Sequence, residues 1–432
     1  MDGLSKIKDL SKNVKYYEDL YEIIWKINLN NKIKKEDYNG IKIGLINTPC
    51  AGFGDIIVCK TFYDYLNKWY PNSKVSICTT TPMKYKDLGV DGNIYKIYNK
   101  KDNSDSECID YDKLTLKKNI IFDIMIIIPI INKTFEINIF KKMIPYANIF
   151  NTFTVSEYNG EYPPYTFPIG VGKGQLGLLM NDFKYKSQKL IKSPYALVYI
   201  QPSPEWGVHS KYCFIAYLEM ICKKYNKHTN FQIIIPEWIE QDLNGDDIFY
   251  KKSMNVIKKY YKNVSIIYSD KSEDYFIEDK NDKSKLTFRA DILPQKREIF
   301  ISLMKDSVED ILVTGDQSLT DIFSCCKENK RVWYQIAPWK KDLSYNLSKE
   351  LPNKYYSTFK TSCGTMRAIN TKIQWDNFMT KYDFRINGKE RMDSIIMGTN
   401  DLKNGGNLQK LLDIIEHSRY LETAKAKIDK LK

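Results

Sequence analysis

The sequence is poor in metal-binding residues: it contains only three histidines, and its nine cysteines form no Cys-x-x-Cys pair. Histidine and cysteine supply most ligands of zinc sites, so this scarcity argues against a zinc centre. Long apolar runs are also missing. The longest, residues 124–131, has eight residues, whereas a membrane-spanning helix needs about 20. We therefore expect neither a bound metal nor a transmembrane segment.

The N-terminus lacks the apolar core of a secretory signal, because charges occur already at Asp2 and Lys6. An odd number of cysteines without such a signal is typical of a reducing compartment. The sequence thus predicts a cytoplasmic protein.

The composition is that of a globular protein, with 43% hydrophobic and 28% charged residues, and 432 residues suffice for two domains. The net charge of +13 favours an acidic partner, which could be nucleic acid, an anionic membrane or a phosphorylated substrate. The lysines are spread along the whole chain, and this argues against nucleic acid, whose binders usually concentrate charge on one face.

Short apolar runs alternate with helical patterns in both halves of the chain. In the first half, a run at 41–47 precedes a glycine loop and a helical pattern, and further strands are expected at 75–79, 94–98 and 120–128. In the second half the expected strands are 196–200, 231–235, 264–268, 310–314 and 331–334, and the expected helices are 210–225, 247–261, 295–305 and 318–326. A polar segment at 269–285 reads as a surface loop. Such alternation favours parallel sheets flanked by helices.

The predicted fold class is α/β, with two Rossmann-like domains in tandem and helical extensions at both ends. The predicted divisions are a helical N-terminal extension at 1–40, a first Rossmann-like domain at 41–156, a linker rich in proline and glycine at 157–194, a second Rossmann-like domain at 195–365 and a C-terminal helical region at 366–432.

The first candidate segment is the loop Gly52, Phe53, Gly54 and Asp55, directly after the first strand. Glycines there permit a ligand to approach closely, and the helix that follows offers free N–H groups at its positive end. The loop does not match Gly-x-Gly-x-x-Gly, because Ile57 occupies the third glycine position. Asp55 could cap the helix or act as a general base on an acceptor hydroxyl. The two roles agree only in part, since a capping carboxylate is stabilised as an anion and becomes a weaker base.

The second candidate segment is Val-Thr-Gly-Asp-Gln-Ser-Leu-Thr-Asp at 313–321, again at a strand-to-helix junction. Gln317 and Ser318 would place an amide, a hydroxyl and several N–H groups at a helix N-terminus, which suits a diphosphate. Asp316 and Asp321 would repel a phosphate in direct contact. Asp316 is better suited to sugar hydroxyls or to capping the helix.

The third candidate segment, 201–211, follows the first strand of the second half. A basic side chain there could neutralise a phosphate leaving group in place of a metal, and Lys211 and His209 are the candidates. A solvated position in the loop is an equally simple interpretation of either. Trp206 reads as a packing residue.

An Asp-x-Asp pair, Asp110 and Asp112, has the form with which many sugar transferases hold a divalent ion. It follows a polar run at 100–107 and not a strand end. We therefore assign no metal role to it.

In their order and spacing the three segments resemble the ADP-heptose:lipopolysaccharide heptosyltransferases, glycosyltransferase family 9, which have the GT-B fold. The resemblance is carried by the glycine and aspartate loop ending at Asp55, by Leu66 and Pro71 in a Leu-x-x-x-x-Pro arrangement, by the segment 202–211 and by the turn 315–318. Protein-arginine rhamnosyltransferases are similar at the last turn. The glycine and histidine that follow this turn in the family are absent here, so heptose is not carried over as the sugar.

The resemblance implies a metal-independent, inverting glycosyltransferase without a cofactor, in which a nucleotide-diphosphate sugar is the co-substrate. Asp55 would be the catalytic base, and the acceptor-side loop would be Gly52, Phe53 and Gly54. The residues expected to bind the donor are Ser203, His209, Lys211, Gly315, Asp316, Gln317 and Ser318. A cleft between the domains would hold both substrates. The acceptor would be a glycan, a protein or, as the least favoured choice, nucleic acid.

Two other functions remain open. A sugar-nucleotide epimerase on the same scaffold would need no acceptor and would release no nucleotide diphosphate. A non-catalytic, basic nucleic-acid-binding or scaffold protein would bind nucleic acid in a manner that weakens steeply with salt.

Overall fold

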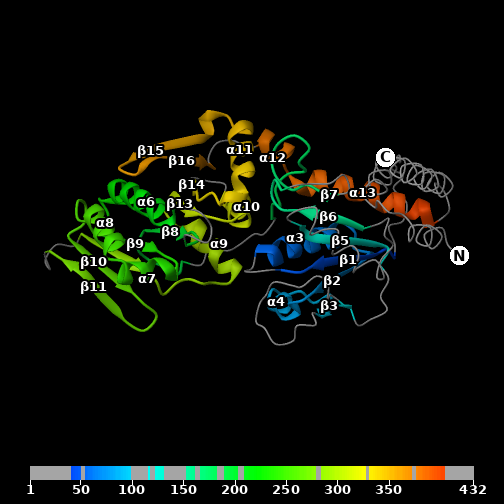
Figure 1. The fold of residues 1–432 in the computed structure, drawn as a ribbon, viewed down its shortest axis with the longest axis horizontal. Helices are drawn as coiled ribbons and strands as arrows, with labels where there is room; N and C mark the ends of the chain where they lie inside the picture. Colours follow the sequence, from blue (N-terminus) through cyan, green and yellow to red (C-terminus); the bar gives the residue numbers. More distant parts are fainter. Residues whose placement is uncertain are drawn as a thin grey trace, which may run out of the picture. The chain divides into compact units, whose positions relative to one another are not determined.

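The structure is a computed structural model that describes residues 40–49, 54–98, 115–116, 122–130, 152–160, 166–181, 189–202, 209–278, 284–326, 330–371 and 376–403. The chain divides into two compact units (Figure 1). The first unit comprises Met1–Leu179 and Lys381–Lys432, and the second comprises Met180–Thr380. Apart from Gly40, the predicted helical extension 1–40 lies outside the described residues.

The first unit contains a seven-stranded sheet in the order β4-β3-β2-β1-β5-β6-β7. Its strands are β1 (Lys42–Asn47), β2 (Lys74–Thr79), β3 (Asn93–Tyr98), β4 (Thr115–Leu116), β5 (Ile124–Ile130), β6 (Thr152–Ser156) and β7 (Thr166–Phe167). All neighbours are parallel except β3 and β4. Strands β2, β3 and β4 lie in sequence on one side of β1, and β5, β6 and β7 lie in sequence on its other side. The strand order therefore reverses between β1 and β5.

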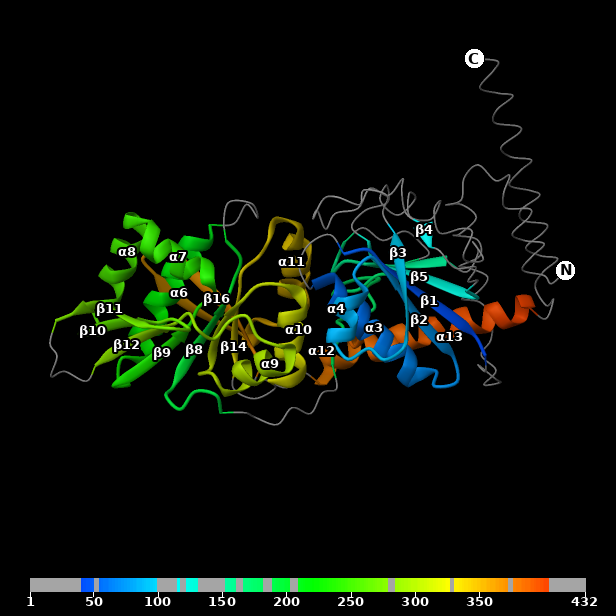
Figure 2. The same cartoon turned by 90° about the horizontal axis from the view of Figure 1, so that it is seen from below.

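Helix α3 (Gly54–Trp69) packs across β1, β2 and β5, and α4 (Pro82–Asp87) follows β2. The C-terminal helix α13 (Phe384–Lys403) belongs to the same unit and passes next to α3 in Figure 2. The ring of Phe384 lies 5.6 Å from that of Phe62, and Tyr70 Oη donates a 2.6 Å hydrogen bond to Asp393. An aromatic contact and a hydrogen bond thus join α13 to Phe62 on α3 and to Tyr70 directly after it.

The short strand β7 lies inside the segment 157–194 that the sequence predicts as a linker. Its Thr166 hydroxyl is 2.5 Å from that of Thr154 on β6, and Phe167 is fully buried. Residues as far as Leu179 belong to the first unit. A strand of two residues leaves no periodic pattern among prolines and glycines, and the sequence interpretation missed it for this reason.

The second unit contains a nine-stranded sheet in the order β11-β10-β12-β9-β8-β13-β14-β16-β15. Its strands are β8 (Tyr195–Tyr199), β9 (Asn230–Ile234), β10 (Asn263–Ile267), β11 (Ser272–Ile277), β12 (Lys285–Arg289), β13 (Asp310–Val313), β14 (Arg331–Tyr334), β15 (Tyr356–Thr361) and β16 (Gly364–Asn370). Six neighbouring strands are parallel, in the order β10-β12-β9-β8-β13-β14. Beyond them, β11 pairs antiparallel with β10 at one edge, and the β15–β16 hairpin pairs antiparallel with β14 at the other. The order reverses between β8 and β13.

The helices of the second unit are α6 (Ser210–Tyr225), α7 (Glu237–Gly245), α8 (Asp247–Ile257), α9 (Arg297–Asp306), α10 (Asp316–Cys325) and α11 (Lys341–Glu350), with short 3₁₀ turns at Pro338–Lys340 and Asn353–Tyr355. Helix α12 (Asp376–Lys381) follows the sheet. The strand orders of the two sheets confirm the predicted fold class of two tandem α/β domains with Rossmann-like parallel sheets.

Three local predictions differ from the structure. The predicted surface loop at 269–285 contains the edge strand β11, and β12 begins at its end. The predicted C-terminal helical region at 366–432 begins within strand β16, and its helices α12 and α13 come later. Helix α10 begins at Asp316, earlier than the predicted 318. Of the missed strands, β11 is an edge strand with largely exposed side chains, so it lacks the apolar pattern of central strands. Strands β6, β12 and β16 lie inside their sheets, and polar residues interrupt the apolar runs that would have marked them.

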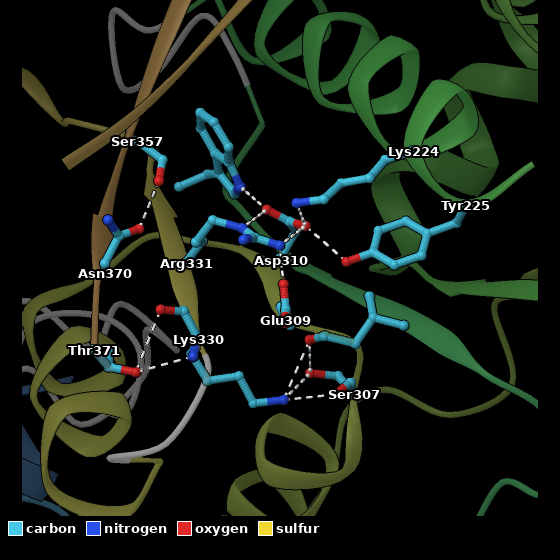
Figure 3. Close-up of polar contacts among 12 residues, drawn as sticks. Lys224, Tyr225, Ser307, Glu309, Asp310, Lys330, Arg331, Ser357, Asn370 and Thr371 are labelled. Atoms are coloured by element: carbon cyan, nitrogen blue, oxygen red, sulfur yellow. Dashed lines mark hydrogen bonds and ion pairs between the residues drawn. The ribbon is translucent and has the colours of Figure 1, made fainter. Parts of the chain in front are cut away.

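A buried carboxylate, Asp310, stabilises the second sheet at the amino ends of its parallel strands. Asp310 begins β13, is fully buried, and accepts hydrogen bonds from Lys224 (2.6 Å), Tyr225 (2.7 Å), Arg331 (2.9 Å) and Trp333 (3.0 Å) (Figure 3). Burial raises the pKa of this carboxyl, but the hydrogen bonds from Arg331 and Lys224 outweigh burial and hold the pKa below its usual value. We interpret this cluster as structural, because it lies at the amino end of β13, away from the turn that begins at Thr314.

Candidate functional site

Both sheets carry the predicted site segments at the point where their strand order reverses. In the first unit Gly54 and Asp55 begin α3, the next described helix after β1, which neighbours β5. In the second unit the segments that begin at Gln201 and Thr314 follow β8 and β13, which are neighbours. Open α/β sheets bind ligands outside the carboxyl ends of strands at such switch points. The sequence-predicted segments therefore lie where each sheet is expected to bind a ligand.

Asp55 is the second residue of α3, and its side chain is half-buried. An acidic residue in the first turn of a helix is stabilised by the positive end of the helix dipole. Since α3 begins at Gly54, Asp55 lies inside the helix and not at the capping position that the sequence left open for it. Gly52 and Phe53 lie outside the described residues.

Asn47, which the sequence interpretation missed, fixes the surroundings of Asp55. It is fully buried at the end of β1, and its Nδ2 donates to Ile128 O (2.8 Å) and to Asp55 O (3.3 Å). Its Oδ1 accepts a 2.6 Å hydrogen bond from Tyr85 Oη. One side chain therefore joins β1, β5, α4 and the start of α3. An amide at the end of an apolar strand was the available signal, because a buried amide needs partners.

The turn between β13 and α10 depends on glycine. Gly315 has φ +83°, a conformation that is strained for other residues, and it precedes the helix. No side chain in the described part of the chain caps the N-terminus of α10. The first helical hydrogen bond runs from Leu319 N to Gly315 O. The positive end of α10, at half-buried Ser318, therefore lies at the switch point without a side-chain cap.

The carboxylate of Asp316 is neutralised. Its Oδ2 lies 2.5 Å from Lys340 Nζ, and its Oδ1 accepts a hydrogen bond from Tyr334 Oη (3.0 Å). The sequence predicts a sugar contact or a helix cap at this residue. The structure engages the carboxylate with Lys340, which comes from the loop after β14, and assigns the capping position to Gly315.

Asp321, the second acid of this segment, is also paired. It forms a salt bridge with Arg297 (2.8 Å) and accepts hydrogen bonds from Asn181 (2.5 Å) and Gln317 (2.9 Å). The amide of Gln317 thus donates towards Asp321 and the helix interior. Because a cation pairs with each acid, the phosphate repulsion expected from the sequence is largely cancelled.

The loops after β8 and β14 are joined by Gln335, another residue that the sequence did not reveal. Its Oε1 accepts from Gln201 N (3.0 Å), and its Nε2 donates to Gln201 O (3.2 Å) and Ser210 Oγ (2.8 Å). Ser210 Oγ also donates to Gln201 O (2.5 Å). Thr314 Oγ1 donates to the backbone oxygen of Gln335 (3.0 Å). Gln335, which is 3% exposed, therefore ties the ends of β8, β13 and β14 to the first residue of α6.

Lys211 and His209 lie at the start of α6. Lys211 Nζ is 2.8 Å from Asp246 and 3.3 Å from Asp242. Burial lowers the pKa of Lys211, but its hydrogen bonds to Asp246 and Asp242 outweigh burial and leave the pKa raised. His209 is exposed and lies next to the ring of Tyr212. Ser203, the third predicted residue of this segment, lies outside the described residues.

Over the part of the chain that the structure describes, no group of three or more histidine, cysteine, aspartate or glutamate residues could hold a metal ion. The pair Asp110 and Asp112 falls outside that part. No helix among the described residues has the length and apolar character needed to cross a bilayer.

Comparisons with known proteins find no matching family model and no matching curated protein. Among solved structures, a mutant O-GlcNAc transferase from Thermobaculum terrenum is similar over 96% of this chain and 77% of its own, with 8% sequence identity and a TM-score of 0.36. An apo structure of OtsA is similar over 91% of this chain and 77% of its own, with 10% identity and a TM-score of 0.25. The heptosyltransferase resemblance stays a prediction from the short sequence motifs.

Proposed function

We propose that the chain is a metal-independent, inverting glycosyltransferase of the GT-B type, which transfers a sugar from a nucleotide-diphosphate donor to an acceptor hydroxyl. One observation carries the proposal: the segments that follow β1, β8 and β13 all begin at the reversal of strand order in their own sheet. That position is the preferred ligand site of open α/β sheets, and the same segments carry the family resemblance.

In the proposed reaction, the acceptor oxygen attacks the anomeric carbon of the donor. The bond from that carbon to the diphosphate oxygen breaks, and its electron pair leaves with the nucleotide diphosphate. Asp55 takes the proton of the acceptor hydroxyl as the general base. The first unit thereby serves the acceptor, which we propose to be a glycan or a protein in the cytoplasm.

The second unit would receive the diphosphate at the N-terminus of α10. Gly315 permits close approach of the backbone, and the helix dipole favours an anion there. Ser318, a half-buried residue of the same first turn, adds a hydroxyl there. Lys340 and Arg297 balance the acids of this segment, so the leaving group would meet a positive helix end without net repulsion.

The remaining proposed donor contacts come from the segment after β8. Lys211 would retain its charge, because its pKa is raised. However, a donor phosphate would compete with Asp242 and Asp246 for the ammonium group of Lys211. We therefore assign Lys211 and His209 to the edge of the donor site, together with Ser203.

The first experiment is a thermal-shift screen against nucleotide diphosphates and their sugars. A ligand that binds only the folded chain stabilises it by about 2.7 kcal/mol at a hundredfold excess over Kd. Incubation with the selected donor alone then separates the two enzyme classes. An epimerase would change the sugar without releasing nucleotide diphosphate, whereas a transferase needs an acceptor for turnover. Salt-sensitive nucleic-acid binding without any nucleotide-sugar binding would favour the scaffold function instead.

The second experiment replaces Asp55 by alanine. Transfer should be abolished while donor affinity stays nearly unchanged, because the base contacts the acceptor. Asp64→Ala on the same helix, where Asp64 pairs with Lys60, is the matched control and should retain transfer. Turnover of Asp55→Ala within a fewfold of the unmodified chain would refute the assignment of the base.

A further inference from the structure

Lysines that are spread along the sequence come together at the amino ends of the parallel strands of the second unit. They lie in the connections that lead into β8, β9 and β10, including the last turn of α6 and the end of α8. Six of them are exposed and form no salt bridge within the described ranges: Lys189, Lys192, Lys223, Lys227, Lys258 and Lys259. We call these six lysines the basic edge.

Backbone pairing places the three connections side by side. Gln232 N on β9 donates to Pro194 O (3.0 Å), directly before β8. Lys285 N at the start of β12 donates to Thr229 O (2.9 Å), directly before β9, and Lys285 pairs with Asn263 at the start of β10. Neighbouring strands lie about 4.8 Å apart, so the starts of β8, β9, β12 and β10 together span only about 14 Å. The fold therefore concentrates charge that the sequence disperses.

Compensation of helix dipoles accounts for only part of the basic edge. Lys223 lies in the last turn of α6, and Lys258 occupies the C-cap position of α8, where cations are favoured. Lys189 and Lys192 lie outside the described helices, in the segment that leads into β8. A ligand of opposite charge would use all of these positions.

Acids at the same ends of the strands already have partners. Glu278 pairs with Lys262 (2.9 Å), and the buried Asp310 pairs with Lys224 (2.6 Å) (Figure 3). These pairs consume other lysines and leave the charge of the basic edge uncancelled. An uncancelled cluster of exposed cations complements an anionic surface.

Exposed aliphatic side chains accompany the lysines. Ile277 at the end of β11 pairs with Asn263 and is 42% exposed, and Leu190, between Lys189 and Ile191, is 48% exposed. Lys258 Nζ lies 4.0 Å from the centre of the Phe276 ring, next to Ile277. Aliphatic side chains can enter the acyl boundary of a bilayer while lysine ammonium groups stay among the headgroups.

The composition of the basic edge favours lipid over nucleic acid. A nucleic acid offers no apolar phase that would receive Ile277 and Leu190. The six cations are all lysines, which act as point charges, and none is an arginine that could grip a phosphate with two hydrogen bonds. Clusters of four to eight basic residues are typical of proteins that bind anionic lipid headgroups.

We propose that the basic edge binds the surface of a membrane that contains anionic lipids. The lysines pair with the headgroups, and Leu190 and Ile277 contact the acyl boundary. This surface is independent of the proposed sugar transfer, because it lies at the ends of the strands opposite to the segments after β8 and β13. Failure of membrane binding would therefore leave donor binding in the thermal-shift screen unchanged.

The test is sedimentation of the full chain with phosphatidylcholine vesicles that contain or lack phosphatidylserine. The chain should sediment only with the vesicles that contain phosphatidylserine, and added salt should weaken this binding. Each lysine near such a surface contributes a factor of about five to the affinity. The double variant Lys192→Glu, Lys227→Glu and the double variant Lys258→Glu, Lys259→Glu should therefore each bind at least about tenfold more weakly.

The matched control is the double variant Lys271→Glu, Lys341→Glu. Both lysines are exposed, Lys271 follows β10, and Lys341 begins α11 after β14, so they lie towards the carboxyl ends of the strands. A strand of five residues separates the two ends by about 16 Å, which is about twice the Debye length at physiological salt. The control changes the same number of charges and should alter vesicle binding less than about twofold.

A second variant tests the apolar contact. Leu190→Ser with Ile277→Ser should weaken vesicle binding about threefold or more without changing the net charge, because less apolar surface leaves water. Since all substituted side chains are exposed, the variants should retain the thermal unfolding profile of the unmodified chain.

Several outcomes overturn the proposal. They are the absence of sedimentation, equal sedimentation with and without phosphatidylserine, a loss in the control as large as in the basic-edge variants, and an unchanged affinity in the serine variant. Binding of single-stranded RNA that depends on Lys192 and Lys227, without vesicle binding, would also overturn it in favour of nucleic acid.

Discussion

Lys340 and Asp316 form a salt bridge at the N-terminus of α10, with 2.5 Å between Nζ and Oδ2. Only 9% of the lysine side chain and 10% of the aspartate side chain is exposed. The pair joins the loop after β14 to the turn after β13. It also removes the negative charge that would oppose an anion at this helix end, since a paired carboxylate repels a second anion far less than an unpaired one.

Breaking this pair from one side should destabilise the second unit. In Lys340→Met the carboxylate of Asp316 stays buried without its cation, so we expect the free energy of unfolding to fall by about 3–5 kcal/mol. The double variant Asp316→Asn, Lys340→Met leaves no isolated charge and should lose less. Urea unfolding followed by circular dichroism measures both. The exposed Lys341→Met is the control, and a loss below about 1 kcal/mol in Lys340→Met would show that the pair contributes little.

Gln335 should be needed to hold the backbone at Gln201. Gln335→Met keeps the shape of the side chain but removes three hydrogen bonds, so we expect a loss of about 1–3 kcal/mol. Amide hydrogen exchange at Gln201 should accelerate, because its N–H loses its acceptor. Gln241→Met, at an exposed position on α7, provides a control with the same change of side chain. Unchanged protection of the Gln201 amide would contradict the predicted role of Gln335.

Several central strands could be predicted from the sequence because burial on both faces leaves a continuous apolar run, whereas the interior strands β6 and β12, which bury Thr154 and Thr287, were missed. Strand β5, Ile124–Ile130, is an example of such a run, since its residues from Ile124 to Ile128 are at most 1% exposed. The side chains of the edge strands β11 and β15 are mostly exposed or half-buried, and these strands leave no such run. Their pairing is decided by partners that are distant in sequence, and no local pattern records it.

The site was predictable only as a set of turns. Glycine at 315 and acids at strand-to-helix junctions mark the ends of strands, and the structure confirms a turn after β13 with positive φ at that glycine. The partners of the acids come from elsewhere: Asp321 pairs with Arg297 on α9, and Asp316 pairs with Lys340. These pairs are set by packing of helices and loops against the sheet. The sequence therefore predicted that Asp316 and Asp321 would repel a phosphate, whereas the structure pairs each of them with a cation.

Lys330 should make stability depend on pH in the alkaline range. It is 6% exposed, and its Nζ donates to Ser307 O (2.5 Å), Ser307 Oγ (3.2 Å) and Val308 O (3.2 Å) (Figure 3). Burial lowers its pKa from 10.5 to about 8, against the opposing charges of Cys326, Asp306, Glu309 and Asp310. Above about pH 8 the folded chain loses this proton while the unfolded chain keeps it. Stability contributed by this group should therefore rise with pH between these two pKa values.

The measurement compares the unmodified chain with Lys330→Met, since tyrosines that titrate in the same range cancel in the difference. The free energy of unfolding of the unmodified chain minus that of Lys330→Met should increase by about 1–2 kcal/mol between about pH 8 and pH 9.5. Parallel pH profiles of the two proteins would show that Lys330 has an ordinary pKa.

Asn47→Ala should weaken the first unit and disturb Asp55 without touching the donor. The substitution leaves Ile128 O and Tyr85 Oη buried without their partner, so we expect a loss of about 2–4 kcal/mol in urea unfolding. Asn67→Ala on α3 removes one hydrogen bond to Tyr63 O at a less buried site and should cost less than about 1 kcal/mol.

If Asp55 is the base, Asn47→Ala should also lower kcat while KM for the donor stays within about twofold, because Asn47 orients the first turn of α3 and contacts no proposed donor residue. A change in donor KM with normal kcat would assign Asn47 and its loop to donor binding instead.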